Sequence, residues 1–275
     1  MSITIRTLRW AFRWWPIMRG RGWILRLAML LLGRGTIRFD VGGGTFIEGR
    51  LSDWLIVWTF MREHERDAGF QHSLDLLQPG AVALDVGAHF GTWSLLAARR
   101  GARVHAFEPV PAMVGRLRDH VALNGLAGEV VINACAAGAE SGSLPFFVVR
   151  DGNSGASSLA RPREDAEETL VPVITLDCYI EQAGIARVDL MKIDVEGAEL
   201  FVLRGARRLL SAASAPVIFF EADDALAARC SASLRDLKGL LADCGYGIYR
   251  WRRGALAPVT IDEPHGHEDL FAVKR

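Results

Sequence analysis

The feature that most constrains the fold is an alternation of short apolar segments with amphipathic ones, which begins near residue 80. The helical period recurs in the intervening segments, and strand-length apolar runs are bounded by glycine, proline or charged residues. The expected strands are 82–86, 103–107, 130–134, 189–193, 217–221, 246–251 and 270–273, and the expected helices are 92–100, 112–124, 198–211 and 231–243. This order predicts an α/β, doubly wound and mostly parallel sheet with helices on both faces.

The chain is expected to have three parts. Residues 1–35 form a basic, Trp-rich extension, residues 36–78 a small N-terminal subdomain, and residues 79–275 the main α/β domain. The subdomain should hold a short hairpin, 36–40 with 45–48 around three glycines, followed by a helix over 53–68. The polar stretch 150–170 is predicted to be a loop or lid within the main domain.

Charge is divided unevenly along the chain. Residues 1–39 hold eight arginines and no acid, whereas the remainder holds 24 basic and 32 acidic residues. Tryptophan with arginine is typical of a helix lying at a membrane surface, so residues 5–32 could contact lipid. The alternative is an amphipathic helix packed on the protein itself or on a partner. The apolar run 23–32 is too short to span a bilayer and contains Arg26. The acidic body disfavours a nucleic-acid partner, because phosphate contacts dominate that affinity.

The four cysteines are far apart and form no metal-ligand or disulfide spacing, which indicates a reducing, cytoplasmic environment. Histidines 265 and 267 invite a metal-site interpretation, but without a distant third ligand they favour a solvated turn before the last strand. No metal is expected.

A glycine loop follows the first strand of the main domain and leads into a helix. Its sequence is Asp85-Val-Gly87-Ala88-His89-Phe-Gly91. Glycines at positions 87 and 91 would let the backbone turn tightly and approach a ligand that a Cβ would block. Asp85 could hold a cationic amino group through the loop.

An acidic residue, Glu108, ends the next strand, 21 residues after Gly87. An acid at this spacing is suited to accept hydrogen bonds from ribose hydroxyls. A dinucleotide fingerprint requires glycine where His89 stands, and the histidine would crowd a diphosphate. The pattern therefore favours S-adenosylmethionine over NAD, and an NAD-dependent oxidoreductase is the weaker enzymatic alternative.

Three acids follow the strand 189–193, at Asp194, Glu196 and Glu199. Asp194 and Glu196 alternate along an extended segment, so both could face the mouth of a crevice at the strand ends. A carboxylate there could take the proton of an attacking hydroxyl. The structural alternatives are that Asp194 or Glu196 caps the following helix and that Glu199 favours its first turn.

With these motifs the sequence resembles the FkbM-type methyltransferases, from about Glu65 to the carboxyl terminus. The most specific segment is Lys192-Ile-Asp-Val-Glu-Gly-Ala-Glu199 after Thr175-Leu-Asp177. The other similar segments are 79–80, 85–91, 106–109, 133–138, 153–159, 203–206 and 219–221.

The resemblance implies a seven-stranded class I methyltransferase (Rossmann-like) sheet with its last strand antiparallel. It implies S-adenosylmethionine as cofactor and O-methylation of a hydroxyl or carboxyl of a sugar, glycolipid or secondary metabolite. Cofactor contacts would come from Asp85, Gly87, Ala88, His89, Gly91, Glu108, Asn133 and Ala134. Asp194 and Glu196 would be catalytic, and Ser157, Ser158 and Glu221 would contact the acceptor.

One alternative from a different class is open. The chain could be a membrane-peripheral binding protein that keeps this fold without its chemistry. Asp85, Glu108, Asp194 and Glu196 favour an enzyme acting on a small-molecule or glycan acceptor. The sequence makes no prediction of oligomeric state.

Overall fold

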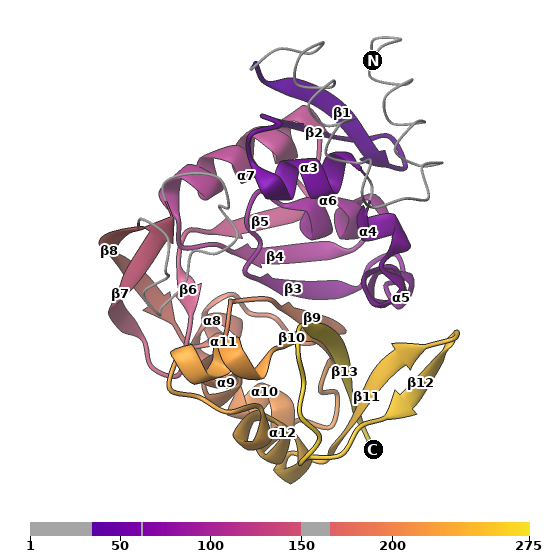
Figure 1. Ribbon diagram of the computed structural model, residues 1–275, viewed down its shortest axis with the longest axis vertical. Coiled ribbons are helices and arrows are strands. Elements are labelled where there is room, and N and C mark those ends of the chain that lie inside the picture. The colour runs from indigo at the N-terminus through magenta and orange to yellow at the C-terminus, as the bar shows by residue number, and fades with distance from the viewer. Residues whose placement is uncertain (1–34, 62, 150–165) are drawn as a thin grey trace.

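The computed structural model describes residues 35–61, 63–149 and 166–275 (Figure 1). The predictions of a basic extension and of membrane contact through residues 5–32 lie outside the described residues, and so does most of the expected loop 150–170. Within the described parts of the chain, no helix combines the length and apolar character needed to cross a bilayer.

The main sheet is doubly wound, as predicted, but it has eight strands in the order β12-β11-β13-β10-β9-β3-β4-β5. The parallel strands are β10, β9, β3, β4 and the edge strand β5, and the last strand β13 is antiparallel to both of its neighbours. The strands are β3 Val82–Val86, β4 Arg103–Phe107, β5 Val130–Asn133, β9 Leu190–Ile193, β10 Val217–Ala222, β11 Tyr246–Arg252, β12 Ala255–Pro258 and β13 Glu268–Lys274. The seven strands predicted from sequence all form.

The prediction of a seven-stranded sheet is wrong by one strand, β12. It pairs antiparallel with β11 through a two-residue turn at Arg253 and Gly254, whose φ angles are 52° and 80°. Two successive positive φ angles give the turn that matches strand twist, and this turn folds the chain back into a hairpin. Arginine is not among the usual residues of such a turn, so the hairpin had little sequence signal.

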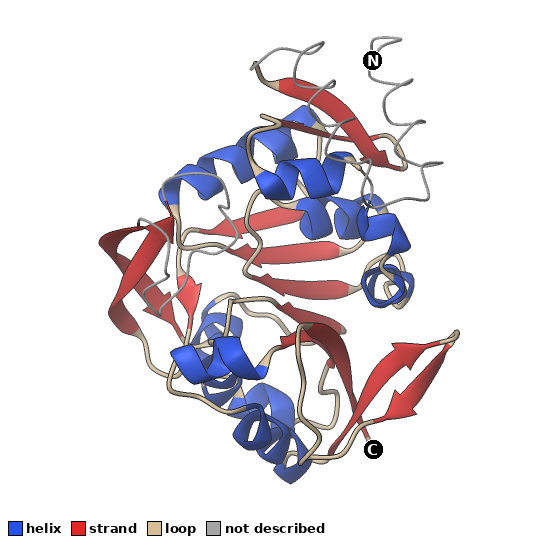
Figure 2. Cartoon of the chain, in the orientation of Figure 1, coloured by secondary structure: helices blue, strands red, loops and turns tan. Residues whose placement is uncertain are grey.

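Helices cover both faces of the sheet, shown in blue in Figure 2. Helices α6 (Thr92–Arg99) and α7 (Pro111–Leu123) contribute to one hydrophobic cluster, which includes Ala83 of β3. Helices α8 (Leu176–Gln182), α9 (Glu199–Arg204), α10 (Arg207–Ser211) and α12 (Leu234–Asp243) contribute to the other, which includes Leu84 and Val86. Successive strand residues thus point to opposite cores, the period expected of a sheet buried on both faces.

Two predicted helices are divided in the structure. The segment 198–211 forms α9 and α10, separated at Gly205, where a Cβ would overlap with the backbone carbonyl of Gly138. The segment 53–68 forms α3 (Trp54–Phe60) and α4 (Glu63–Arg66), and Asp67 then caps the next helix, α5 (Ala68–Asp75). Capping by Asp67 stops one helix and starts another because its carboxylate accepts from the Phe70 N–H.

The predicted N-terminal hairpin is confirmed as β1 (Ile37–Gly42) and β2 (Thr45–Gly49). It packs on α7, where Asn124 Oδ1 accepts from the Phe46 N–H at 2.7 Å and His120 Nε2 lies 3.0 Å from the backbone of Glu48. His120 Nδ1 also lies 2.8 Å from the Phe90 carbonyl, so this histidine joins the hairpin to the glycine loop.

A second, three-stranded sheet was not predicted. It contains β6 (Ala136–Ala137), β7 (Gly142–Val149) and β8 (Ala166–Ile174), in the order β6-β8-β7. The prediction that residues 166–170 belong to a loop is wrong, because they pair antiparallel with residues 145–149. Their polar side chains lie on a largely exposed sheet, where no apolar alternation is required. The short helix α11 (Asp224–Arg229) was also not predicted.

Candidate active site

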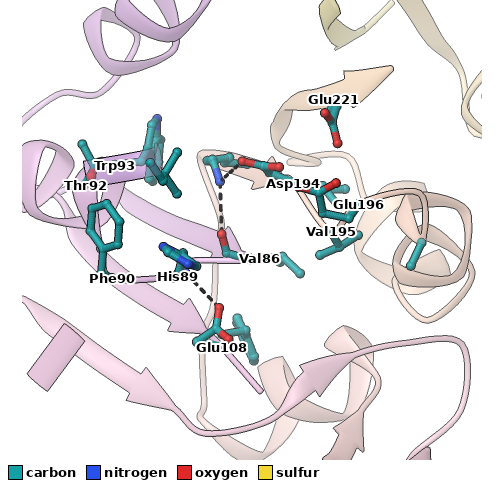
Figure 3. Close-up of a pocket in the computed structure, with 18 of the residues that line it drawn as sticks. Val86, His89, Phe90, Thr92, Trp93, Glu108, Asp194, Val195, Glu196 and Glu221 are labelled. Atoms are coloured by element: carbon teal, nitrogen blue, oxygen red, sulfur yellow. Dashed lines mark hydrogen bonds and ion pairs between the residues drawn. The ribbon is translucent and has the colours of Figure 1, made fainter. Parts of the chain in front are cut away.

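The strand order reverses between β3 and β9, and a cavity of about 470 Å³ opens at the carboxyl ends of β3, β4, β9 and β10 (Figure 3). Ligands of open α/β sheets bind at such a reversal point. Helices α3 and α5 and the start of β13 complete the walls, through residues such as Trp58, Phe70 and Asp269. The cavity is therefore formed by the carboxyl ends of these strands together with parts of the N-terminal and C-terminal segments.

The glycine loop forms one wall, and its backbone is left-handed at three positions. The φ angles are 83° at Gly87, 52° at His89 and 94° at Gly91. A Cβ on Gly87 would overlap with the Asp194 carbonyl oxygen, and one on Gly91 would overlap with the Leu117 side chain. Gly87 therefore requires glycine for space as well as for conformation. At Gly91 the contact is with the end of a side chain that can move, so the positive φ angle is the main requirement.

His89 stands at the loop position where a dinucleotide-binding fingerprint would have glycine. Its ring lies 4.7 Å from that of Phe90, centroid to centroid, and lines the cavity. Neither ring nitrogen has a hydrogen-bond partner among the described residues, although both are buried. Burial lowers the pKa of His89 to about 4, so the ring is neutral at physiological pH.

Glu108, at the end of β4, has both carboxylate oxygens held by backbone donors. Oε2 accepts from the His89 N–H at 2.9 Å and Oε1 from the Val110 N–H at 2.8 Å. Burial raises the pKa of Glu108 to about 7, against the opposing effect of these hydrogen bonds. Each oxygen keeps a second lone pair, so the fixed carboxylate can still accept from a ligand hydroxyl.

Asp85 lies beneath the loop and does not line the cavity. It is fully buried, accepts from Ser94 Oγ at 2.6 Å, and lies 3.2 Å from Lys192 Nζ. The same ammonium lies 3.1 Å from Asp194 Oδ2, and this carboxylate does line the cavity. Burial opposes ionisation of Lys192, yet Asp194 and Asp85 raise its pKa above the usual range. Lys192 thus links the buried aspartate to the cavity wall.

Carboxylates crowd the opposite wall. Burial raises the pKa of Glu196 to about 9, with further contributions from Glu221, Asp194 and Glu199, and burial raises that of Asp269 to about 8. Burial also raises the pKa of Glu199 to about 7, although its Oε1 accepts from the Val195 and Gly197 N–H groups. Glu199 thus satisfies the backbone of the turn after β9 and lies in the first turn of α9, as one structural alternative predicted. The N-cap of α9 is Ala198, so neither Asp194 nor Glu196 caps this helix.

The C-terminal loop brings His267 into the site. Its Nδ1 lies 2.8 Å from Glu221 Oε1, and this hydrogen bond raises the pKa of His267 to about 9. The expectation of a solvated turn is wrong for His265, which is buried with its Nδ1 2.6 Å from Glu268 and its Nε2 3.1 Å from Lys238 Nζ. In the parts of the chain that the structure describes, no three His, Cys, Asp or Glu residues are grouped to hold a metal ion.

The structure brings most of the predicted site residues together. Those lining the cavity are Gly87, Ala88, His89, Gly91, Glu108, Asp194, Glu196 and Glu221. Three do not line it: Asp85, described above, Asn133, whose amide donates to Ala106 and Tyr179, and Ala134, which is exposed. Ser157 and Ser158 lie outside the described residues.

Several cavity residues escaped the sequence analysis. Aromatic side chains of the N-terminal segment, Trp58 and Phe70, line it with Asp67, and so do His267 and Asp269 of the C-terminal segment. The His-Gly-His-Glu-Asp motif was a usable signal for the last two, but only the pairing of β13 with β10 places Asp269 opposite Glu221.

Known proteins resemble this chain over the same region. The family model for the methyltransferase FkbM domain matches residues 85–248, which is more than half of the chain. The 31-O-demethyl-FK506 methyltransferase FkbM of Streptomyces tacrolimicus is 32% identical over 165 residues, 49% of this chain and 62% of that protein. Methyltransferase sdnD of Sordaria araneosa is 30% identical over 166 residues, 49% of this chain and 64% of that protein.

The matched regions therefore span less than two thirds of these relatives. Among solved structures, methyltransferase FkbM from Methylobacillus flagellatus is similar with a TM-score of 0.47 and 19% identity, covering 81% of this chain and 53% of that one. The family model includes the glycine loop, Glu108 and the segment 192–199, which are the elements that build the cavity. The chain belongs to the family of FkbM-type methyltransferase domains.

Proposed function

We propose that this protein transfers a methyl group from S-adenosylmethionine to a hydroxyl oxygen of a small-molecule or glycan acceptor. The observation that carries the proposal is Glu108, whose carboxylate is fixed by the His89 and Val110 N–H groups beside the Gly87 turn. This arrangement suits a ribose with no phosphate next to it. Methylation of the acceptor's carboxyl instead of its hydroxyl is the variant that the same site allows.

The residues present fit the donor in one further respect. The ring nitrogens of His89, which lines the cavity, are buried and have no hydrogen-bond partner among the described residues. When bound, S-adenosylmethionine supplies a methyl group on a positively charged sulfonium. The carboxylates of Asp194 and Glu221 face the same cavity and would stabilise a cation there.

The protein's main contribution would be positioning, which can supply about 7–11 kcal/mol of a transfer barrier. The cavity would bring the acceptor oxygen into line while Trp58 and Phe70 exclude water from the side opposite the sheet. A carboxylate would also take the hydroxyl proton, and the sequence prediction of Asp194 or Glu196 for this role is compatible with their place on the cavity wall. Ser157, Ser158 and membrane contact through residues 5–32 remain predictions.

Calorimetric titration with S-adenosylhomocysteine, with NADH as a comparison, tests the donor. We expect S-adenosylhomocysteine to bind and NADH not to bind, and Glu108→Ala to abolish the binding while the exposed variant Glu129→Ala retains it. Tight NADH binding, or no binding of either compound, would remove the proposal. Tritium transfer from S-adenosylmethionine to glycerol, methyl glucoside and p-nitrophenol then tests the acceptor chemistry.

A further inference from the structure

Glu221 presents a carboxylate oxygen that no described group satisfies. Its side chain lines the cavity from the end of β10 and the residue is only 8% exposed. Oε1 lies 2.8 Å from His267 Nδ1, whereas Oε2 is buried and has no hydrogen-bond partner in the part of the chain that the structure describes. A buried carboxylate oxygen without a donor is unfavourable. Oε2 is therefore positioned to receive a hydrogen bond from a ligand.

Figure 3 shows Glu221 directed from the end of β10 toward Asp194 and Glu196. The β10–β13 ladder places Asp269 directly opposite Glu221, and His267 lies two residues before Asp269. Glu221 thus lies near the carboxyl end of β10, beside the C-terminal segment that contains His267 and Asp269. An acceptor seated between these two parts would reach Oε2.

The neighbouring carboxyl groups are less suited to take a proton. Asp194 Oδ2 is engaged by Lys192 Nζ at 3.1 Å. Burial raises the pKa of Glu196 to about 9 and that of Asp269 to about 8, so both hold a proton at neutral pH. Glu199 Oε1 accepts from two backbone N–H groups and is only 2% exposed.

His267 favours the ionised form of Glu221. Burial raises the pKa of Glu221, and the hydrogen bond from His267 opposes that rise. The groups that act on Glu221 from the surrounding elements are His267 and the acids Asp194, Glu196, Glu199, Asp223 and Asp269. Since His267 is the one cation in this set, it stabilises the ionised form.

We infer that Glu221 is the general base for the acceptor hydroxyl and that His267 is a positioning residue that engages Oε1 and leaves Oε2 free. As the acceptor oxygen bonds to the methyl carbon, the carbon–sulfur bond breaks with its electron pair going to sulfur, and the hydroxyl proton passes to Oε2. The proton leaves to water when the methylated product departs. This inference rests on the proposed function and assigns the base to Glu221 in place of Asp194 or Glu196.

Kinetics of four proteins test the assignment: wild type, Glu221→Gln, His267→Gln and the control Glu181→Gln, whose exposed carboxylate pairs with Arg208 outside the cavity. The probes are glycerol, an aliphatic alcohol that needs a base, and p-nitrophenol, which is largely ionised at pH 8. Glu221→Gln should lower the rate on glycerol by about 100-fold or more and affect p-nitrophenol much less. His267→Gln should move the acid limb of the pH–rate profile to higher pH, because Glu221 loses its cation. Glu181→Gln should behave as wild type.

Nuclear magnetic resonance of protein with isotope-labelled histidine tests the Glu221–His267 pair in the absence of the methyl donor and the methyl acceptor. The His267 pKa should be raised in wild type and should return toward the ordinary histidine value in Glu221→Gln. An unchanged His267 pKa, or an unchanged glycerol rate in Glu221→Gln, would overturn the inference. Failure of every variant to bind S-adenosylhomocysteine would instead overturn the proposed function, so the two failures are distinguishable.

Discussion

Gly87 and Asp194 contact each other across the seam between β3 and β9, with the Gly87 Cα facing the Asp194 carbonyl so closely that a Cβ would overlap with it. The Asp194 N–H also donates to the Val86 carbonyl at 3.0 Å. The two strand ends are thus joined where the cavity opens, and the turn on β3 holds the first residue after β9. Four predictions follow from this construction and from the buried charges around it.

Replacing Gly87 by alanine should disturb both the fold and the donor site. The backbone has φ of 83°, and the new Cβ would push against the Asp194 carbonyl. We expect a loss of about 1–3 kcal/mol in the free energy of unfolding, measured by urea denaturation, and weakened S-adenosylhomocysteine binding.

Gly80→Ala is the matched control for this change. Gly80 has a similar φ of 85°, but a Cβ there would meet no atom of the described residues within 4 Å. It should show only the conformational cost and bind S-adenosylhomocysteine normally. Equal effects of the two substitutions would show that contact with Asp194 is unimportant.

Donor affinity should depend on the ionisation of Glu108. Burial raises the pKa of Glu108 to about 7, so the carboxylate forms as pH rises through neutrality. Calorimetry should show S-adenosylhomocysteine binding more tightly at pH 8 than at pH 6, because the ionised group accepts hydrogen bonds more strongly. Glu108→Gln should bind about 1.5–3 kcal/mol more weakly at pH 8 and lose this pH dependence. A pH dependence retained in Glu108→Gln would assign it to another group.

Removing Lys192 should destabilise the protein strongly. Asp85 is fully buried, and Lys192 lies 3.2 Å from it with a side chain only 8% exposed. Lys192→Met leaves an uncompensated buried charge and should cost about 3–5 kcal/mol in the free energy of unfolding. The double variant Asp85→Asn with Lys192→Met should recover much of this loss in the same measurement.

An exposed ion pair provides the comparison. Arg38 and Glu48 lie 2.7 Å apart with side chains 58% and 40% exposed. Arg38→Met should change the free energy of unfolding by about 1 kcal/mol or less. If Lys192→Met lowered the free energy of unfolding no more than Arg38→Met does, the buried pair of Lys192 and Asp85 would not be important for stability.

The stability of the protein should fall as pH rises because of Glu196. Burial raises the pKa of Glu196 to about 9 in the folded state, well above that of an unfolded glutamate. The folded state therefore binds more protons between about pH 4.5 and 9, and its stability decreases through that range. Glu196→Gln should remove this contribution and be more stable than wild type at pH 8, by about 1 kcal/mol or more.

Denaturation at pH 5 and pH 8 measures this difference. The gain should be small at pH 5, where Glu196 carries a proton in the folded state and resembles glutamine. Glu129→Gln, at an exposed position, should show no such pH dependence. An equal gain in the free energy of unfolding of Glu196→Gln at both pH values would contradict a raised pKa of Glu196 in the folded state.

Much of the fold and of the donor side of the site could be predicted from sequence. The strands β3 and β4 begin and end at the predicted residues, because each is an apolar run bounded by glycine or charge. The loop Gly87–Gly91 and Glu108 follow these strands directly, so locating the strands also located the residues at their carboxyl ends. Local periodicity and the spacing of residues along the chain were sufficient to predict this part of the cavity.

The side of the cavity proposed to hold the acceptor depends on tertiary structure. His267 and Glu221 are far apart in the chain, and only the antiparallel pairing of β13 with β10 brings them within 2.8 Å of each other. Burial and contact likewise leave Glu221 Oε2 without a hydrogen-bond partner among the described residues. They also place Asp269 beside Glu221 and put Asp85 next to Lys192, away from the cavity. The sequence determined which strands form and which residues end them, whereas the packing of distant segments decided which acids are ionised and what they face.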